Sequence, residues 1–220
     1  MKVVIFTGPS LSHEEAKEIF DEAEYRAPIR RGDAIKALKE GIRVLGIIDG
    51  VFHQDVAISP REILEVMREG AIVVGGSSIG ALRAAELCDL GMIGVGEIFR
   101  MFRSGELDSD DEVAVLINPE TLEAISEPLV NIRATISALV KKGVIETELG
   151  NELIRLAKRM HYSKRSYENL LEEAVKSHLL SLGDAEKLLK MMRENAVNLK
   201  KLDAIKVVET VKEICSAEKF

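Results

Sequence analysis

Residues 71–80 read Ala-Ile-Val-Val-Gly-Gly-Ser-Ser-Ile-Gly, and this stretch decides the fold class. Its four leading apolar residues are typical of a buried strand in a parallel sheet, and the Ala- and Leu-rich residues 81–87 that follow are strong helix formers. The junction between strand and helix matches the pattern Gly-x-Ser-x-Gly, with Ser78 at its centre. A serine on so tight a turn presents its hydroxyl outside the sheet, near the N–H groups that open the helix. This geometry suits either nucleophilic attack on a carbonyl or the binding of an anion.

Further strands and helices alternate on both sides of this junction. Residues 3–6 and 44–48 are short apolar runs that predict strands, and residues 113–117 are a candidate for a fourth strand. Strand, helix and strand in this rhythm indicate a mostly parallel sheet with flanking helices and right-handed crossovers.

Three of the predicted helices carry start signals. Ser12 and Glu15 have the spacing of a capping box. Asp33 is expected to cap a helix over residues 34–40, and a Ser-Pro pair at residues 59–60 is typical of the start of a third helix. These signals place helices between the predicted strands.

The character of the sequence changes after Asn118. Residues 119–220 consist of segments rich in Glu, Lys and Leu with helical spacing. The predicted architecture is therefore α/β, with a sheet domain over residues 1–118 that carries the serine turn. An all-helical region over residues 119–220 is expected to follow it and pack on it.

Composition and charge exclude several classes of function. Hydrophobic residues make up 46% and charged residues 30% of the chain, which is ordinary for a soluble globular protein. No apolar run approaches membrane-spanning length and the N-terminus enters a strand directly, so we expect a cytoplasmic protein without membrane association. The net charge of -7 argues against a strong, sequence-independent grip on nucleic acid. Cys88 and Cys215 show no metal-ligand spacing, and neither a metal nor a cofactor is expected.

A nucleophilic serine needs a base, and no histidine is compelling in that role. His13 lies in the first turn of a predicted helix and His178 in a polar helical stretch, where solvent exposure is the simpler interpretation; His161 lies where a helix ends. His53 is the best placed, because it follows Asp49 at the end of a strand, where parallel sheets collect ligand-binding residues. Asp49 could also bind a metal, although no regular ligand spacing supports this.

A lysine is the other candidate base, provided that burial or a cationic neighbour lowers its pKa from about 10.4 toward neutrality. In the predicted final helix Ala204, Val207 and Val211 form an apolar row that Lys200 heads. Lys201 heads the adjacent row in the same way. A lysine that continues an apolar stripe often extends its amine to water instead, so both interpretations stay open.

Other polar residues are candidates for supporting the site or binding a substrate. Residues 26–33 put three arginines, including Arg30, in a predicted loop that could grip a carboxylate or a protein tail, although a solvated loop is the simpler interpretation. Arg83 and Glu86 lie one helical turn apart, where they could orient the site or pair with each other. The role of the acidic run over residues 108–112 stays open.

Several stretches of the chain resemble the TfuA family. The resemblance covers most of residues 1–135 and is weaker in the C-terminal half, and the fold it implies is a family-specific one. It is carried by Phe-Thr-Gly-Pro-Ser-Leu (6–11), Ile-Asp-Gly-Val-Phe (48–52), Gly-Ser-Ser-Ile-Gly-Ala-Leu-Arg-Ala-Ala-Glu-Leu (76–87), Gly-Met-Ile-Gly-Val-Gly (91–96), Asp-Asp-Glu-Val-Ala (110–114), Ser-Glu-Pro-Leu-Val-Asn-Ile-Arg (126–133) and Lys-Lys-Leu-Asp-Ala (200–204).

This resemblance implies a specific activity and specific partners. TfuA proteins accompany YcaO enzymes, which use ATP to activate a peptide backbone amide before sulfur replaces its oxygen. The expected function is hydrolysis of a thiocarboxylated ubiquitin-like carrier similar to ThiS, which releases sulfide for a substrate such as the methyl-coenzyme M reductase of methanogens. The resemblance also implies a Ser–Lys pair, which the motifs place on Ser78 and Lys200, with Lys201 as the adjacent alternative. Association into a homo-oligomer stays open.

The turn offers further groups for such a reaction. The N–H groups of Ile79 and Gly80 are candidates to stabilise the oxyanion, and Gly76 lets a substrate approach closely. Ser10, in the turn after the first strand, could add an oxyanion donor or only cap the next helix.

Three other functions compete with hydrolysis. The protein could be an adaptor without catalysis of its own, which binds YcaO and its peptide substrate. A persulfide on Cys88 or Cys215 could relay sulfur, although packing in a helix is the simpler interpretation of Cys88. The turn could also bind a phosphate, but it lacks the Gly-x-x-x-x-Gly-Lys-Ser/Thr spacing of a P-loop.

Overall fold

The computed structural model describes residues 1–52, 56–118, 120–121 and 123–217, and the candidate residue His53 lies outside this part. The chain divides into two compact units. The first consists of Met1–Asp110 together with Lys200–Phe220, and the second of Asp111–Leu199. The final helix thus belongs to the sheet unit, whereas the sequence analysis assigned all of residues 119–220 to one helical region. The physical reason is the apolar face of that helix, which completes the core on one side of the sheet.

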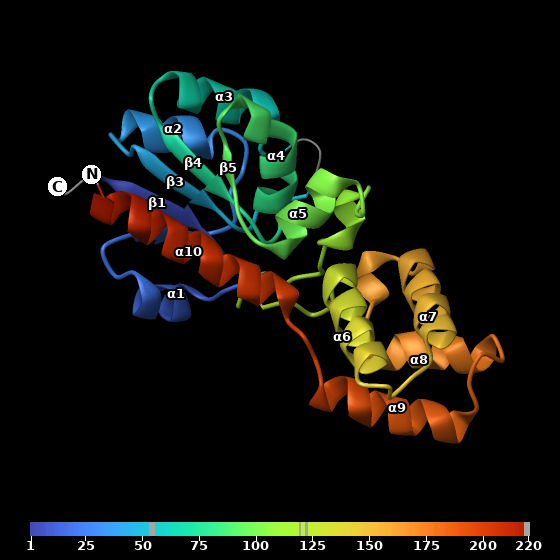
Figure 1. The fold of residues 1–220 in the computed structure, drawn as a ribbon. Coiled ribbons are helices and arrows are strands. Elements are labelled where there is room, and N and C mark those ends of the chain that lie inside the picture. Colours follow the sequence, from blue (N-terminus) through green and yellow to red (C-terminus); the bar gives the residue numbers. More distant parts are fainter. Residues whose placement is uncertain (53–55, 119, 122, 218–220) are drawn as a thin grey trace. The chain divides into compact units, whose positions relative to one another are not determined.

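A five-stranded parallel sheet forms the centre of the first unit (Figure 1). Its strands are β1 (Val3–Phe6), β2 (Glu24–Arg26), β3 (Val44–Ile47), β4 (Ile72–Gly75) and β5 (Ile93–Gly94). They lie in the order β2-β1-β3-β4-β5, so the chain passes from one side of β1 to the other between β2 and β3. Ligands of open parallel sheets bind outside the carboxyl ends of the strands at such a reversal. The predicted α/β fold class is confirmed.

The strands differ in how well the sequence predicts them. The predicted strands over residues 3–6 and 44–48 and the strand before the serine turn are confirmed as β1, β3 and β4. The edge strands β2 and β5 are only three and two residues long, too short for a periodic signal. The prediction of a strand over residues 113–117 is wrong, because in that run only Ile117 pairs, in an isolated antiparallel bridge with Ala124.

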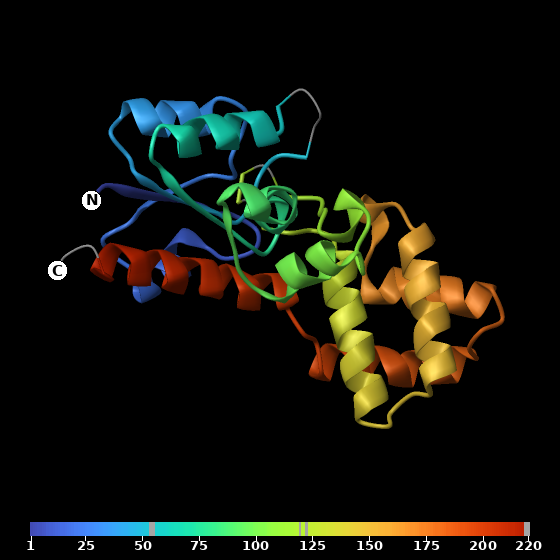
Figure 2. The same ribbon diagram turned by 45° about the horizontal axis from the view of Figure 1, so that its top comes forward.

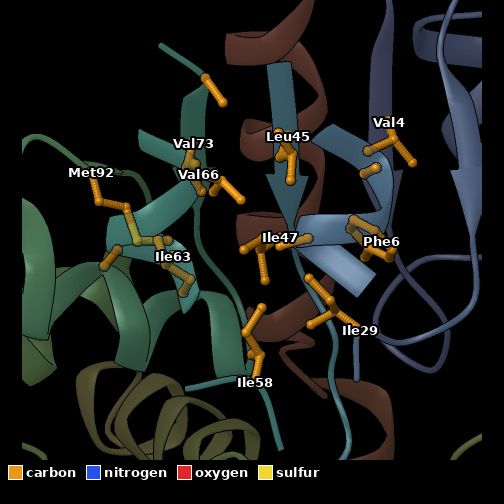
Figure 3. Close-up of a cluster of buried hydrophobic side chains, with 14 of the residues drawn as sticks. Val4, Phe6, Ile29, Leu45, Ile47, Ile58, Ile63, Val66, Val73 and Met92 are labelled. Carbon is orange, nitrogen blue, oxygen red and sulfur yellow. The ribbon is translucent and has the colours of Figure 1, made fainter. Parts of the chain in front are cut away.

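Helices cover both faces of the sheet (Figures 1 and 2). The helices of this unit are α1 (His13–Ile19), α2 (Asp33–Lys39), α3 (Pro60–Arg68), α4 (Ile79–Leu87), η1 (Cys88–Leu90), α5 (Glu97–Ser104) and α10 (Leu199–Ala217). On one face α2, α3 and α4 pack over alternate strand residues such as Val4, Leu45 and Val73 (Figure 3). On the other face α1 and α10 pack over the intervening residues, such as Ile5 and Val74. This division follows the two-residue period of a strand.

The apolar row of the last helix is a core surface. Ala204, Val207 and Val211 are fully buried and belong to one cluster with strand residues of β1, β3 and β4. A Cβ atom on Gly46 of β3 would lie 3.3 Å from Val211 Cγ2, so strand and helix are in close contact. Each fully buried valine stabilises the fold by roughly 1.5–3 kcal/mol. This burial fixes α10 against the sheet and thereby fixes the position of Lys200, at its start.

The helix start signals are confirmed in two cases and corrected in one. The Ser12–Glu15 capping box is present at α1, and Ser59 accepts a hydrogen bond from the Glu62 N–H at the start of α3. Asp33, by contrast, is the first residue of α2 and its carboxylate accepts the Arg30 N–H. The buried Glu62 carboxylate caps α2 in place of Asp33. It accepts the N–H groups of Gly32 and Ala34, the two residues that flank Asp33.

The second unit is helical. Its elements are η2 (Asp110–Glu112), which begins at the last residue of the first unit, α6 (Leu129–Lys141), α7 (Thr147–Arg159), η3 (Tyr162–Lys164), α8 (Tyr167–Lys176) and α9 (Leu182–Glu194). Residues of α6, α7, α8 and α9 share one apolar cluster. The buried Glu112 carboxylate accepts hydrogen bonds from Arg133 at 2.8 and 2.9 Å, and the buried Arg165 pairs with Asp111. Asp111 and Glu112 of the acidic run are therefore paired with arginines of the same unit. Across the described ranges of the chain, helices long and apolar enough for a membrane span are absent.

Candidate active site

The turn between β4 and α4 has its conformational strain at Ser77. Ser77 adopts a φ of +68°, a left-handed conformation that non-glycine residues rarely adopt. Its side chain is fully buried and donates a hydrogen bond of 2.8 Å to the carbonyl oxygen of Lys200. The strained residue therefore ties the serine turn to the start of α10.

Ser78 follows as the residue that precedes the first turn of α4. It is 2% exposed, yet its side chain does not cap the helix. Within the part of the chain that the structure describes, its hydroxyl makes no other hydrogen bond, although serines at this position usually donate or accept locally. The hydroxyl is thus nearly enclosed and is not engaged in a structural hydrogen bond with the described residues.

Lys200 and Lys201 have different environments. The Lys200 side chain is 4% exposed, and its Nζ lies 3.9 Å from Asp49 Oδ1. The Lys201 side chain is 40% exposed and pairs with Glu15 of α1. The hydrogen bond from Lys201 holds the pKa of Glu15 below its usual value. Of the two lysines, Lys200 is the one that the fold encloses, and its carbonyl group contacts the serine turn.

Asp49 follows β3 and is held by the loop after β1. Its Oδ2 accepts the N–H groups of Gly8 and Ser10 at 3.0 and 2.9 Å, and its Oδ1 accepts the Ser10 hydroxyl at 2.6 Å. The sequence analysis expected Ser10 to donate to an oxyanion or to cap the next helix. The structure corrects this expectation, because Ser12 caps α1 and the Ser10 hydroxyl is occupied by Asp49.

The glycines of the turn have clear packing roles. A Cβ atom on Gly80 would lie 1.8 Å from the carbonyl oxygen of Ile47, and a Cβ atom on Gly76 would lie 2.7 Å from Val207 of α10. No larger residue fits at either position without movement of the backbone or of the helix. The Gly-x-Ser-x-Gly pattern is therefore needed for close packing whatever chemistry the serine performs.

The two N–H groups expected to form an oxyanion site differ in availability. The Gly80 N–H donates to the carbonyl oxygen of Ile48 at 3.3 Å, so the structure uses it to hold α4 against β3. Ile79 is the first residue of α4, where the helix itself offers no acceptor for the N–H. Ile79 is therefore the better placed of the two donors.

The remaining candidates are either engaged in structural contacts or exposed. Arg83 donates to the carbonyl oxygen of Ile58 at 3.0 Å and to Glu86 at 2.7 Å, which favours the interpretation that Arg83 and Glu86 pair with each other. Arg30 is exposed. His13 Nε2 lies 3.3–3.4 Å from two backbone carbonyl oxygens. The described ranges contain no cluster of three His, Cys, Asp or Glu side chains that could hold a metal ion.

Sequence reasoning missed one buried residue of this region, Asp203. Its Oδ2 accepts the Ile98 N–H at 2.7 Å, and its Oδ1 accepts Lys206 Nζ at 3.2 Å. A Cβ atom on Gly96, at the start of α5, would lie 2.3 Å from the Asp203 carboxyl carbon. Asp203 thus caps α5 from the neighbouring helix, because Gly96, the residue before the first turn of α5, has no side chain that could do so.

The arrangement as a whole collects polar groups at one end of the sheet. The loops after β1, β3 and β4 contribute Ser10, Asp49 and Ser78, and α10 contributes Lys200, which contacts two of these loops. The structure thus brings Lys200 into contact with Ser77 and Asp49, and it leaves the nearly enclosed Ser78 hydroxyl next to the bonded Ser77 at the start of α4.

Comparison with known families adds one match. A family model described as TfuA-like protein matches residues 49–166, which is more than half of the chain. The matched segment begins at Asp49 and includes Ser78, and it ends before Lys200. No curated protein matches the chain.

Proposed function

The chain belongs to the TfuA-like protein family, and from this premise we propose that it is a hydrolase that releases sulfide from a thiocarboxylated carrier protein. The carrier is a ubiquitin-like protein similar to ThiS. The sulfide serves a YcaO-type enzyme that converts a peptide backbone amide into a thioamide, as in methyl-coenzyme M reductase. The carrier protein and the YcaO-type enzyme act together with this protein in the cytoplasm.

One observation carries the proposal. Ser78 is 2% exposed with a hydroxyl that the described residues leave uncommitted, and the serine before it is bonded to the backbone of the enclosed Lys200. A hydroxyl used only for structure would cap its helix, as the Ser12 and Ser59 hydroxyls do. The uncommitted Ser78 hydroxyl is therefore best explained by a substrate.

The reaction proceeds by acyl transfer to serine. The neutral Lys200 amine takes the hydroxyl proton as the Ser78 oxygen attacks the thiocarboxylate carbonyl. The tetrahedral intermediate collapses with cleavage of the C–S bond and leaves an ester on Ser78. The departing sulfide takes the proton from the Lys200 ammonium and leaves as HS⁻, so the amine is neutral again. Lys200 then removes a proton from water, which hydrolyses the ester, releases the carrier carboxylate and returns the proton to Ser78.

The oxyanion of the intermediate needs a donor at the start of α4. The Ile79 N–H supplies it, together with the positive end of the helix dipole. The loss of one such donor in an acyl-transfer enzyme costs about 3 kcal/mol of transition-state stabilisation. Sulfide is a good leaving group, so that step needs little help from an acid.

The test measures sulfide released from a thiocarboxylated carrier without YcaO. Ser78→Ala and Lys200→Ala are expected to reduce the rate by roughly 10³-fold or more, while circular dichroism reports a retained fold. Lys201→Ala is the matched control, because it removes the adjacent lysine that pairs with Glu15, and it is expected to retain activity. Full activity of folded Lys200→Ala would remove this lysine from the mechanism.

A non-catalytic adaptor that binds YcaO and its peptide substrate is the second candidate. The packing roles of Gly76 and Gly80 favour it, because they explain the motif without catalysis. An adaptor releases no sulfide on its own and still binds YcaO after Ser78→Ala. Sulfide release by the isolated wild-type protein therefore separates the two functions.

A further inference from the structure

A single buried carboxylate, that of Asp49, joins the loop after β1 to the lysine on α10. Its Oδ2 accepts the N–H groups of Gly8 and Ser10, and its Oδ1 accepts the Ser10 hydroxyl. The same Oδ1 lies 3.9 Å from Lys200 Nζ. Because three donors hold the carboxylate, it cannot turn away from the lysine without losing hydrogen bonds.

The lysine is fixed at both ends. Ser77 holds its carbonyl oxygen, and Asp49 lies next to its amine. The side chains of Lys200 and Asp49 are 4% and 2% exposed, so solvent screens their attraction far less than it screens a surface ion pair. The charge of Asp49 therefore acts strongly on the amine.

Other charged groups on the neighbouring elements have partners of their own. Glu15 of α1 pairs with Lys201, and Asp203 accepts the Ile98 N–H and the Lys206 amine. The side chains of the serine turn are neutral. Among these carboxylates, Asp49 is the one in contact with the Lys200 amine.

We infer that Asp49 is a positioning residue, which orients the Lys200 amine and stabilises the ammonium that forms when this amine takes the Ser78 proton. The inference rests on the hydrolase function proposed above. A buried carboxylate acts in this way on the imidazolium of the Ser-His-Asp triad. Ser10 supports the arrangement, because its hydroxyl fixes the carboxylate oxygen that faces the lysine.

The decisive variant is Asp49→Asn, which keeps the shape of the side chain and removes its charge. Without the carboxylate, the Lys200 ammonium loses its proton at lower pH. The acid limb of the pH profile of kcat/KM for sulfide release should move to lower pH by on the order of one pH unit. The plateau should fall by roughly 10- to 100-fold, because the amine is less well oriented.

Two further variants separate charge from structure. Asp49→Glu keeps the charge at a changed length, so its plateau should fall while the acid limb stays near that of the wild type. Glu62→Gln is the matched control, because Glu62 is also a buried carboxylate that accepts loop N–H groups but has no contact with Lys200 among the described residues. It should lower the melting temperature and leave the pH profile in place.

A second measurement keeps the inference separate from the hydrolase proposal. The titration of the Lys200 amine is followed by NMR of ¹³C-labelled lysine, with the signal assigned through Lys200→Arg. A lower titration midpoint in Asp49→Asn than in wild type supports the inference even if no sulfide is released. Equal midpoints in the two proteins, or an acid limb that does not move in an active Asp49→Asn protein, would overturn it and leave hydrolysis by Ser78 intact.

Discussion

The hydrogen bond from Ser77 to the carbonyl oxygen of Lys200 is the contact whose removal tests the site most informatively. It joins positions 123 residues apart in the sequence, and both residues are buried. Ser77→Ala removes the donor and keeps the strained backbone, whereas Ser77→Gly removes the donor and relieves the strain of a φ of +68°. The pair of variants therefore separates two free-energy terms.

The magnitudes follow from these two terms. A lost hydrogen bond in a buried setting costs about 1–3 kcal/mol, so Ser77→Ala should lower the free energy of unfolding by that amount. A left-handed conformation costs a non-glycine residue about 1–2 kcal/mol. Ser77→Gly should therefore be more stable than Ser77→Ala by about 1 kcal/mol. Both variants should lose sulfide-release activity, because the start of α10 is no longer held at the turn.

The assay is urea unfolding followed by far-UV circular dichroism, since the chain contains no Trp. Equal slopes m among the variants make the midpoints comparable. Ser59→Ala is the control, because it removes the cap of α3 and costs about 1 kcal/mol without touching the site. A Ser77→Ala protein as stable as wild type, or a Ser77→Gly protein less stable than Ser77→Ala, would refute this account of the turn.

Three further outcomes follow from the structure. Gly80→Ala should lower the free energy of unfolding by more than about 3 kcal/mol in urea titrations, because its Cβ atom would lie 1.8 Å from a strand carbonyl oxygen; near-wild-type stability would contradict this packing. Burial raises the pKa of both Tyr25 and Tyr167 from 10.0 to about 12, so their neutral forms stabilise the fold below pH 10 and this contribution is lost as the pH rises from 10 to 12. The phenylalanine variants at these positions should accordingly show a smaller drop in urea midpoint between pH 9 and pH 11.5, and an unchanged drop would contradict the assignment. Asp203→Asn should weaken the cap on the Ile98 N–H and destabilise the protein by about 1 kcal/mol in the same assay, whereas a stability equal to that of the wild type would show that the cap is unimportant.

Local signals predicted much of the fold. The apolar runs of β1, β3 and β4 and the start signals of α1 and α3 follow from near neighbours in the chain, so the sequence reveals them directly. The edge strands β2 and β5 do not, because pairing with a neighbour defines such short segments. The apolar run over residues 113–117 was wrongly predicted to be a strand. Its composition is typical of a strand, but the described part of the fold provides no neighbouring strand with which it could pair.

The site depends on contacts that no local pattern reveals. Periodicity identified Lys200 as the head of an apolar row, but only the packing of α10 on the sheet distinguishes it from the exposed Lys201. The hydrogen bond from the Ser10 hydroxyl to Asp49 joins residues 39 positions apart in the sequence, so no local pattern predicts it. The strain at Ser77 is likewise invisible in a sequence where two serines stand side by side.

The central claim is that the Ser78 hydroxyl performs the chemistry. Its most direct test is the ratio of kcat/KM for sulfide release between folded Ser78→Ala and the wild type, with purified thiocarboxylated carrier and no YcaO. The account predicts a ratio of roughly 10⁻³ or less. A ratio within tenfold of unity, in a variant with the circular dichroism spectrum of the wild type, would contradict it.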